Sequence, residues 1–281
     1  MTRVRILLCL VAIALLGARS EAEDAGASAR GDLDLLRSAF ERTLHAPGVR
    51  SVELRVHRAG QLVSRRAFDV AYRRDTDQAR SLLRFTAPSY LRGQALLVLE
   101  SPDGISDTWL YQAEERRPRR VGTAHKADSF YGSDLSFEEL EHQRFEHFAL
   151  RRLPDAEEAG LSCAVIEAVP QHESQYGRLV VWIDAARTAI ARVDFYRGAG
   201  REPVKRLRVS LDQVVEESGY LRIQTMRVDQ IGRDAWTEVV TERMEIDPAI
   251  SADVFSAAFL EREGEDLYAL VSRKSSVGGA P

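Results

Sequence analysis

Residues 129–140 read SFYGSDLSFEEL, and this stretch decides the fold together with the strand-like runs before it. An aromatic pair precedes Gly132, which gives the backbone the freedom to turn. Ser136 is followed three residues later by Glu139, which is the spacing of a capping box, so a short helix is expected to begin there. The stretch carries no catalytic motif, yet its order is too specific for a generic linker.

Three strand-like runs precede this stretch and occupy residues 82–85, 94–100 and 108–111. Turn-forming residues separate them, with Pro88 and Gly93 after the first run and the dipeptide Asp103-Gly104 after the second. Apolar and β-favouring residues dominate the runs, as strands require. The pattern predicts a β-meander, and the basic segment RRPRR at residues 116–120 connects it to the stretch at 129–140.

Both halves of the chain show a period-two alternation of apolar and polar residues. It recurs around residues 52–56, 68–72, 164–168, 179–183, 191–195, 207–211 and 221–225. The outward positions are mostly charged, for example Arg192 and Asp194. Alternation repeated this often predicts one antiparallel sheet with a wet face and an apolar face.

Three short helices are expected to accompany the sheet. Residues 32–44 place apolar residues at helical spacing, and the pair Pro47-Gly48 ends that segment. A second helix is expected after Ser136 and a third near Ser251. The predicted fold class is therefore mainly β with a few short helices (α+β), built on a curved antiparallel sheet.

The amino terminus has the composition of a secretory signal peptide. Arg3 and Arg5 precede an apolar run at residues 6–17, and small residues near Ala18 offer cleavage sites. The run is shorter than the ~20 residues that span a bilayer, so an uncleaved anchor is the lesser alternative. The chain is thus expected in the periplasm, organised as a signal peptide at 1–22, a flexible lead at 23–30, a single domain at 31–262 and a loosely ordered tail at 263–281.

Composition and residue chemistry argue against several functions. The formal net charge of -4 does not favour a nucleic-acid partner. Cys163 is the only cysteine left after cleavage, and its apolar neighbours favour a buried structural role over a catalytic thiol. The histidines are scattered without metal-ligand spacing, and no Gly-x-Ser-x-Gly motif occurs. The sequence therefore predicts no catalytic residue, no cofactor and no metal site.

The order of these segments resembles the outer-membrane lipoprotein-sorting protein family, the LolA-like group. The resemblance covers roughly residues 50–262 and rests on Phe85 with Pro88, Arg92-Gly93 and Leu96, residues 109–111, Arg120-Val121, residues 129–134, residues 181–184, Lys205 with Leu207, and residues 250–255 with Leu260. It implies a half-open antiparallel β-barrel plugged by helices, which carries acyl chains or other apolar cargo across the periplasm.

A sheet with one apolar face needs a cover, because exposed apolar surface costs about 25 cal/mol per Å². Short helices fill a curled sheet only partly, so a ligand-sized cavity can remain. The residues alone agree equally well with an inner face that packs on itself as a core and leaves no cavity. The candidates for lining such a cavity are apolar residues at alternating positions, namely Phe68, Val70, Leu83, Phe85, Leu96, Val98, Trp109 and Tyr111. The expected lid consists of Phe130, Tyr131, Gly132, Ser133 and Asp134, of which the last two also suit helix capping.

The resemblance implies a periplasmic carrier or chaperone for lipid, lipoprotein acyl chains or another hydrophobic cargo. Such a carrier would contact membranes only transiently and would act as an accessory to an inner-membrane exporter of the RND type. Two alternatives remain open, a lipoprotein-sensing regulator of an anti-sigma factor and a small outer-membrane β-barrel. The basic segment at 116–120 is either a solvated turn or a contact for lipid head groups or a transporter.

Overall fold

The computed structural model describes residues 30–75, 78–100, 106–212, 214–246, 250–262, 264 and 266–272. The predicted signal peptide at 1–22, most of the lead at 23–30 and the Asp103-Gly104 turn lie outside the described residues. The first described element is a helix whose described part covers residues 30–44 and includes the predicted helix at 32–44. Within the described ranges, none of the helices is both long enough and apolar enough to cross a membrane.

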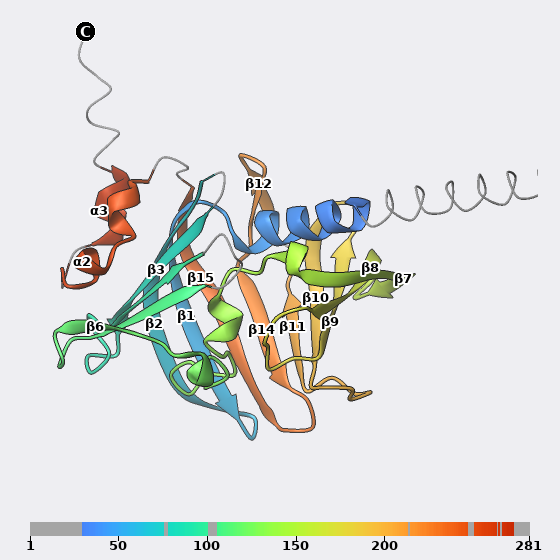
Figure 1. Cartoon of the computed structure of the whole chain (residues 1–281), viewed down its shortest axis with the longest axis horizontal. Helices are drawn as coiled ribbons and strands as arrows, with labels where there is room; N and C mark the ends of the chain where they lie inside the picture. The colour runs from blue at the N-terminus through green and yellow to red at the C-terminus, as the bar shows by residue number, and fades with distance from the viewer. Residues whose placement is uncertain are drawn as a thin grey trace, which may run out of the picture.

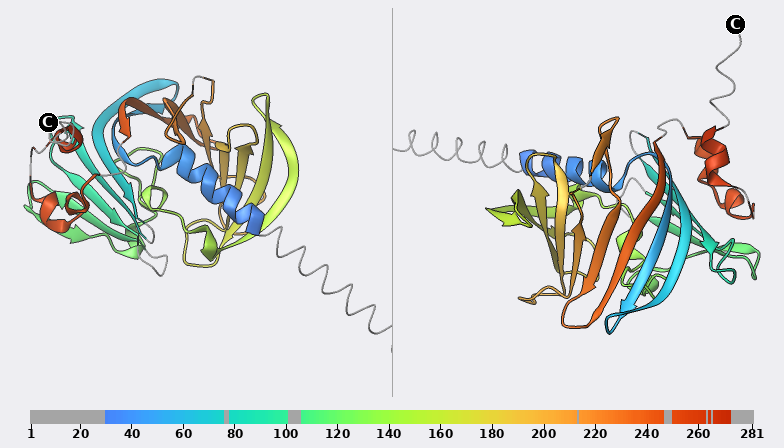
Figure 2. Two further views of the ribbon diagram at one scale, coloured as in Figure 1. Left: turned by 90° about the horizontal axis from the view of Figure 1, so that it is seen from above. Right: turned by 180° about the vertical axis from the view of Figure 1, so that it is seen from behind.

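The strands have the following bounds: β1 Gly48–Arg58, β2 Gln61–Arg74, β3 Ala79–Ala87, β4 Ala95–Leu99, β5 Asp107–Gln112, β6 Arg117–Arg120, β7 Phe148–Glu158, β8 Leu161–Pro170, β9 Arg178–Asp184, β10 Ala189–Tyr196, β11 Lys205–Val209, β12 Val215–Glu217, β13 Tyr220–Arg222, β14 Thr225–Gln230 and β15 Ala235–Ile246. Thirteen of them form one sheet in the order β6-β5-β4-β3-β2-β1-β15-β14-β11-β10-β9-β8-β7, while β12 and β13 form a separate hairpin. The sheet curls without closing, because β6 and β7 are its two edges (Figure 1, Figure 2). The predicted half-open barrel of mainly β class is confirmed.

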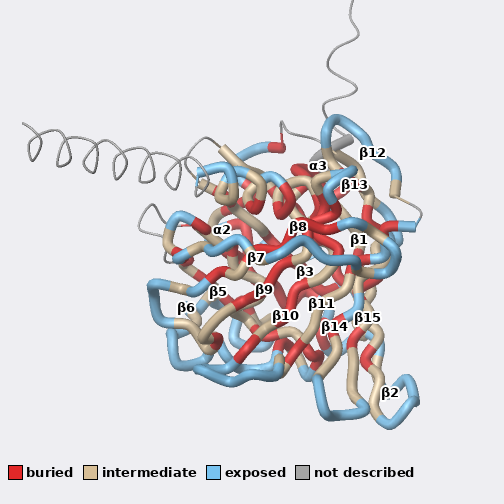
Figure 3. The backbone as a smooth tube through the Cα atoms, turned by 90° about the vertical axis from the view of Figure 1, so that its right-hand side faces the viewer, coloured by how far each residue is buried: buried red, intermediate tan, exposed pale blue. Residues whose placement is uncertain are grey.

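Strands from opposite ends of the chain meet in the middle of the sheet. β1 pairs with β2 on one side and with β15 on the other, both antiparallel. The first meander therefore runs outward from β1 to the edge at β6, and the second returns from the edge at β7 to β15. Figure 3 shows β7 and the β12–β13 hairpin on the exposed surface, with the buried residues between the layers.

A two-residue turn connects β1 and β2. Ala59 and Gly60 both have positive φ, 49° and 72°. A two-residue turn with these angles matches the twist of the flanking strands. The strand expected at 221–225 is divided between β13 and the start of β14, and β7 and β15 were not predicted at all.

The outer face of the second half is charged, as the alternation predicts. Asp194 accepts hydrogen bonds from Arg206 (2.8 Å) and Arg192 (2.9 Å). Burial by itself would raise the pKa of Asp194, but the hydrogen bonds from these two arginines outweigh it and hold the pKa below its ordinary value. Because its charges are paired with one another, the outer face of β10 and β11 needs no apolar segment to cover it.

The outer face of the first half is apolar, which corrects the expectation of a single wet face. Leu82 on β3 and Leu97 on β4 point outward and are both 0% exposed. They pack against the carboxyl-terminal segment, which contains η4 (Ala252–Val254), α2 (Ala257–Leu260) and α3 (Leu267–Ser272). The continuous apolar run of β4 is the pattern of a strand that is buried on both faces.

Helix α3 lies inside the segment expected to be a loosely ordered tail. Leu267 and Tyr268 are buried against the sheet, and the Tyr268 hydroxyl donates to the Arg243 carbonyl (3.0 Å). These contacts attach the start of α3 to the sheet. Residues 273–281 lie outside the described part of the chain.

Two segments cover the inner face. The helix at 30–44 lies across the open side of the barrel (Figure 2) and packs Leu36 and Phe40 against Phe145, Phe148 and the inner residues of β8–β10. Residues 121–147 form the second cover, which contains the single turns η1 (Thr123–His125), η2 (Glu138–Leu140) and η3 (Phe145–His147). We call residues 121–147 the inner cover.

Candidate functional site

The half-open barrel keeps an internal cavity of about 180 Å³ between its inner face and the inner cover. Its body is apolar and is lined by Val52, Leu54, Phe68, Val70, Leu83, Leu96, Val98, Leu135, Leu140, Leu207, Met226, Val228 and Val239. The lining also contains polar residues, which are His45, Arg50, Tyr72, Ser81, Glu139, Glu141, His142 and Thr241. We call this space the inner cavity.

A smaller cavity of about 90 Å³ lies beside the inner cavity under the helix at 30–44. The two share five lining residues, namely Leu44, Leu135, Glu139, Leu207 and Val228. Because these side chains line both spaces, rotation of Leu44, Leu135 or Leu207 could connect the two cavities.

Five of the eight predicted lining residues surround the inner cavity, and they are Phe68, Val70, Leu83, Leu96 and Val98. Phe85 belongs to the same inner core but stacks on Phe130, with ring centroids 5.7 Å apart. Trp109 and Tyr111 lie on the opposite face of β5, against the carboxyl-terminal segment. Trp109 and Tyr111 point outward because Leu110, which lies between them and pairs with Leu96, points inward.

Sequence reasoning missed the cavity residues contributed by β14 and β15. Val228 and Val239 line the inner cavity from strands that the alternation did not reveal. Leu207 came from a predicted strand and could have been added from its alternation alone. A period-two pattern shows which residues share a face but not which face turns inward, so distant strands cannot be matched by pattern alone.

The predicted lid segment lies within the inner cover. Phe130 is 0% exposed, and the Tyr131 hydroxyl donates to Gln94 Oε1 (2.7 Å). Burial raises the pKa of Tyr131 to about 12, so its hydroxyl keeps its proton. Tyr131 and Gly132 have φ of 49° and 74°, which turns the chain back towards the sheet.

Ser133 and Asp134 do not cap a helix, since the first helical turn after them starts at Glu138 with Phe137 as its N-cap. Asp134 instead accepts hydrogen bonds from Arg58 on β1 (2.8 Å) and from the Thr237 hydroxyl on β15 (2.7 Å). The Asp134 amide also donates to the Thr237 oxygen (2.9 Å). This side chain fastens the inner cover to the two strands at the centre of the sheet.

A second anchor holds the inner cover to β11. Glu139 accepts from Lys205 Nζ (2.6 Å), and their side chains are only 7% and 8% exposed. The Tyr176 hydroxyl donates to the same carboxylate, and burial together with Glu139 raises the pKa of Tyr176. The other Glu139 oxygen accepts from the Ser136 amide (2.9 Å), which is half of the predicted capping box. The helix stays short because the Ser136 hydroxyl accepts from Gln175 (2.9 Å) and caps no helical amide.

Three further sequence features find their places outside the cavity. The basic segment ends in β6, an exposed edge strand where Arg120 forms an ion pair with Asp107. Cys163 is buried on β8, and burial raises the pKa of its thiol. Among the described residues, no cluster of three or more His, Cys, Asp or Glu side chains could hold a metal ion.

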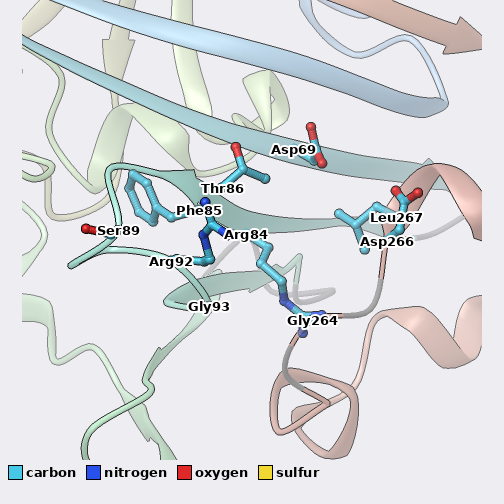
Figure 4. A pocket seen from close by; sticks show the side chains of 10 residues that line it. All are labelled: Asp69, Arg84, Phe85, Thr86, Ser89, Arg92, Gly93, Gly264, Asp266 and Leu267. Carbon is cyan, nitrogen blue, oxygen red and sulfur yellow. The ribbon is translucent and has the colours of Figure 1, made fainter.

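A larger cleft, of about 730 Å³, lies on the outer face between β2, β3 and the carboxyl-terminal segment (Figure 4). Asp69, Arg84, Arg92 and Asp266 line it and bring both signs of charge together. Arg84 is 5% exposed and donates to the carbonyls of Phe259 (2.9 Å) and Arg262 (2.8 Å). Because Arg84 serves to attach the carboxyl-terminal segment, the inner cavity with its mainly apolar lining is the better candidate site.

A family model with the description "Uncharacterized protein" matches residues 77–262. No curated protein sequence matches the chain. A solved outer membrane lipoprotein-sorting protein domain from Vibrio parahaemolyticus has a TM-score of 0.74 at 24% identity, covering 82% of this chain and 98% of its own. A DUF1329 family protein from Desulfovibrio piger has a TM-score of 0.73 at 22% identity, covering 83% and 98% respectively.

A LolA superfamily protein from Nitrosomonas europaea has a TM-score of 0.64 at 15% identity, covering 80% of this chain and 97% of its own. At these identities the likeness concerns the fold. The resemblance inferred from residues 85–134 and their continuation is thus confirmed as a LolA-like fold.

Proposed function

The chain belongs to the family whose model matches residues 77–262 and has the LolA-like fold, and from this premise we propose that it is a periplasmic carrier of acyl chains or similar apolar cargo. The inner cavity is the observation that carries the proposal. A sheet whose inner face merely formed a core would be filled at the density of organic crystals, with few voids larger than water. A space of about 180 Å³ with a mainly aliphatic lining is instead suited to hydrocarbon.

The volume limits what enters the cavity in the closed arrangement. Pockets for drug-sized ligands measure roughly 300–1,000 Å³, whereas an apolar cavity of about 150 Å³ accepts benzene. The inner cavity at about 180 Å³ therefore takes one end of a hydrocarbon chain, and the adjoining cavity of about 90 Å³ offers the way to accommodate more of it. Each buried methylene contributes about 0.8 kcal/mol, so the affinity should rise with each further methylene that the two cavities admit.

The test is binding of dodecanol to the mature chain, measured by displacement of the neutral fluorophore N-phenyl-1-naphthylamine. Val98→Phe fills the cavity from β4, and we expect it to weaken dodecanol binding at least ten-fold. The same change at Val63, which is 56% exposed near the β1–β2 turn, serves as the matched control and should leave binding unchanged. Absence of displacement from the unmutated chain, or equal binding by both variants, would count against a carrier.

We also propose that the carrier works with an inner-membrane exporter and is exported by its amino-terminal signal. The resemblance to lipoprotein-sorting proteins and the basic edge strand β6 support a membrane partner. Cross-linking in cells, followed by purification of the tagged chain from the periplasmic fraction, should retrieve an exporter subunit. Recovery of an anti-sigma factor without an exporter would favour the regulator instead.

A further inference from the structure

Four of the polar lining residues lie close together in one part of the wall of the inner cavity, which we call its polar end, and they come from four different segments. His45 follows the helix at 30–44, Arg50 lies on β1, Tyr72 on β2 and His142 in the inner cover. The three rings contact one another, with centroid distances of 5.2 Å for His45–Tyr72, 5.4 Å for His45–His142 and 5.3 Å for Tyr72–His142. The cluster closes one end of an otherwise aliphatic space.

His142 is 5% exposed, and neither of its ring nitrogens has a hydrogen-bond partner among the described residues. A neutral imidazole carries one donor and one acceptor, and leaving such a group unsatisfied in the interior costs about 1–3 kcal/mol. Nearly all buried polar groups in proteins are paired, so an unpaired one at a cavity wall calls for a partner. A ligand in the cavity is the natural partner, because His142 lines that space.

Arg50 brings an unbalanced positive charge to the same end. One of its N–H groups is donated to the Leu44 carbonyl at the end of the first helix (2.8 Å), which is a common arrangement for a basic side chain. No carboxylate among the described residues lies within ion-pair distance of it. The neighbouring Arg74 differs, since it lies 3.4 Å from Glu41 and 3.5 Å from Glu100. Helix capping thus accounts for one N–H of Arg50, and the described part of the chain supplies no counter-ion for its charge.

The two carboxylates that line the cavity are already neutralised. Glu139 accepts from Lys205 (2.6 Å), and Glu141 accepts from Lys126 and from the Thr108 hydroxyl, both at 2.9 Å. They do not reach Arg50 within ion-pair distance. The uncompensated charge at this end of the cavity is therefore positive.

The histidines add donors without adding charge. Burial, followed by the charges of Arg74 and Arg50, lowers the pKa of His142 to about 3. Burial, followed by His142 and the same two arginines, lowers the pKa of His45 well below its ordinary value. Both rings are therefore neutral near pH 7, and each can donate one N–H to an acceptor. Such a set of groups disfavours a cation and suits an anion.

We propose that the polar end binds the anionic head group of a single-chain amphiphile, a carboxylate or a phosphate, while the tail lies along the apolar body of the inner cavity. The inference rests on the proposed carrier function and specifies its cargo. Arg50 supplies the charge, and His142 and His45 supply directed donors, so a bound anion would give Arg50 a counter-ion and give the two rings an acceptor. A bound anion would also accept a hydrogen bond from the His142 ring, whose nitrogens otherwise have no partner among the described residues.

The experiment compares four ligands with the same twelve-carbon tail, namely dodecanoate, dodecyl phosphate, dodecanol and dodecyltrimethylammonium, in the displacement assay at pH 7.5. At least one anion should bind about 10- to 100-fold more tightly than dodecanol, as charge-assisted hydrogen bonds imply. The trimethylammonium ligand should bind more weakly than dodecanol. If dodecanoate binds more tightly than dodecyl phosphate, the cargo is assigned to the fatty acids. The reverse order assigns it to phosphorylated lipids.

Three variants locate the preference. His142→Phe removes the donor but keeps a ring in place, and Arg50→Gln removes the charge but keeps an N–H for Leu44. Each should reduce the anion preference about ten-fold or more while dodecanol binding stays within about two-fold. His125→Phe, at an exposed position, is the matched control and should behave like the unmutated chain.

The outcomes separate the two proposals. If dodecanol binds as tightly as both anions, or if both variants keep the full preference, the anion site is overturned and the carrier function stands. If none of the four ligands binds, the carrier function fails and the anion site fails with it. Urea denaturation of each variant at pH 7.5 shows whether a loss of binding reflects a loss of folding.

Discussion

The unpaired buried imidazole makes the stability of the chain depend on pH. We expect acidification from pH 7.5 to pH 5.0 to lower the free energy of unfolding by about 2 kcal/mol through His142 alone. The folded-state pKa of His142 is lowered to about 3, whereas an unperturbed histidine has a pKa of 6.5. The unfolded chain therefore binds the proton first, and folding must expel it.

The magnitude follows from the distance between these two pKa values. Stability falls by about 1.36 kcal/mol for each pH unit below 6.5 until the folded-state pKa is reached. The interval from 6.5 to 5.0 accounts for about 2 kcal/mol, and His45 contributes with the same sign because its pKa is also lowered. Burial raises the pKa of Glu141, which acts in the opposite direction as the pH falls. Arg50 and Arg74 keep their charge throughout this range.

The assay is urea unfolding, followed by tryptophan fluorescence, at both pH values. His142→Phe should lose about 2 kcal/mol less on acidification than the unmutated chain, because the offset from Glu141 is common to both. The exposed His125→Phe serves as the control and should keep the full dependence. Carboxylates with lowered pKa, such as Asp194, lose their contribution mainly below pH 5 and are avoided by this window. Equal pH dependence of the unmutated chain and His142→Phe would refute the reasoning.

Three further outcomes can be checked independently. Lys205→Met should destabilise the chain by about 3 kcal/mol in urea because it leaves Glu139 buried without its cation, and adding Glu139→Gln should restore part of the loss. Cys163 should react with a thiol reagent only when the chain unfolds, since it is buried and burial raises its pKa. Truncation after residue 256 should expose Leu82 and Leu97 and increase the binding of a hydrophobic dye above that of the full chain, and saturating dodecanol should not displace the additional dye.

Strand positions were predictable because alternation is a local property. The pattern at residues 191–195 gave both the strand and its charged outer face, which Arg192 and Asp194 occupy as expected. The run at 108–111 did not reveal which of its residues point into the barrel, because β5 carries apolar residues on both faces. The sequence gives only one indication that a segment also covers the outer face. This indication is the unbroken apolar run of β4, which is typical of a strand buried on both faces.

The candidate site was predictable in its apolar body and not in its polar end. Residues such as Phe68 and Leu83 occupy alternating apolar positions, and this pattern predicts an inner face. His45 and His142 stand far apart in the sequence, and His45 lies between the apolar residues Leu44 and Ala46 whereas His142 lies between Glu141 and Gln143. They meet only because β1 and the inner cover converge at the same end of the barrel. Contacts set by topology leave no periodic trace in the chain.

The two ends of the inner cavity act on cargo in different ways. The aliphatic body contributes free energy in proportion to the methylenes it buries, and it distinguishes poorly between tails of similar length. The polar end contributes little to a ligand without an acceptor, because Arg50 and His142 then stay unpaired, but it gains strongly from one that carries an anion. Affinity therefore comes mainly from the tail and selectivity from the head group. A substitution at His142 is accordingly expected to change the selectivity while the affinity for a neutral chain persists.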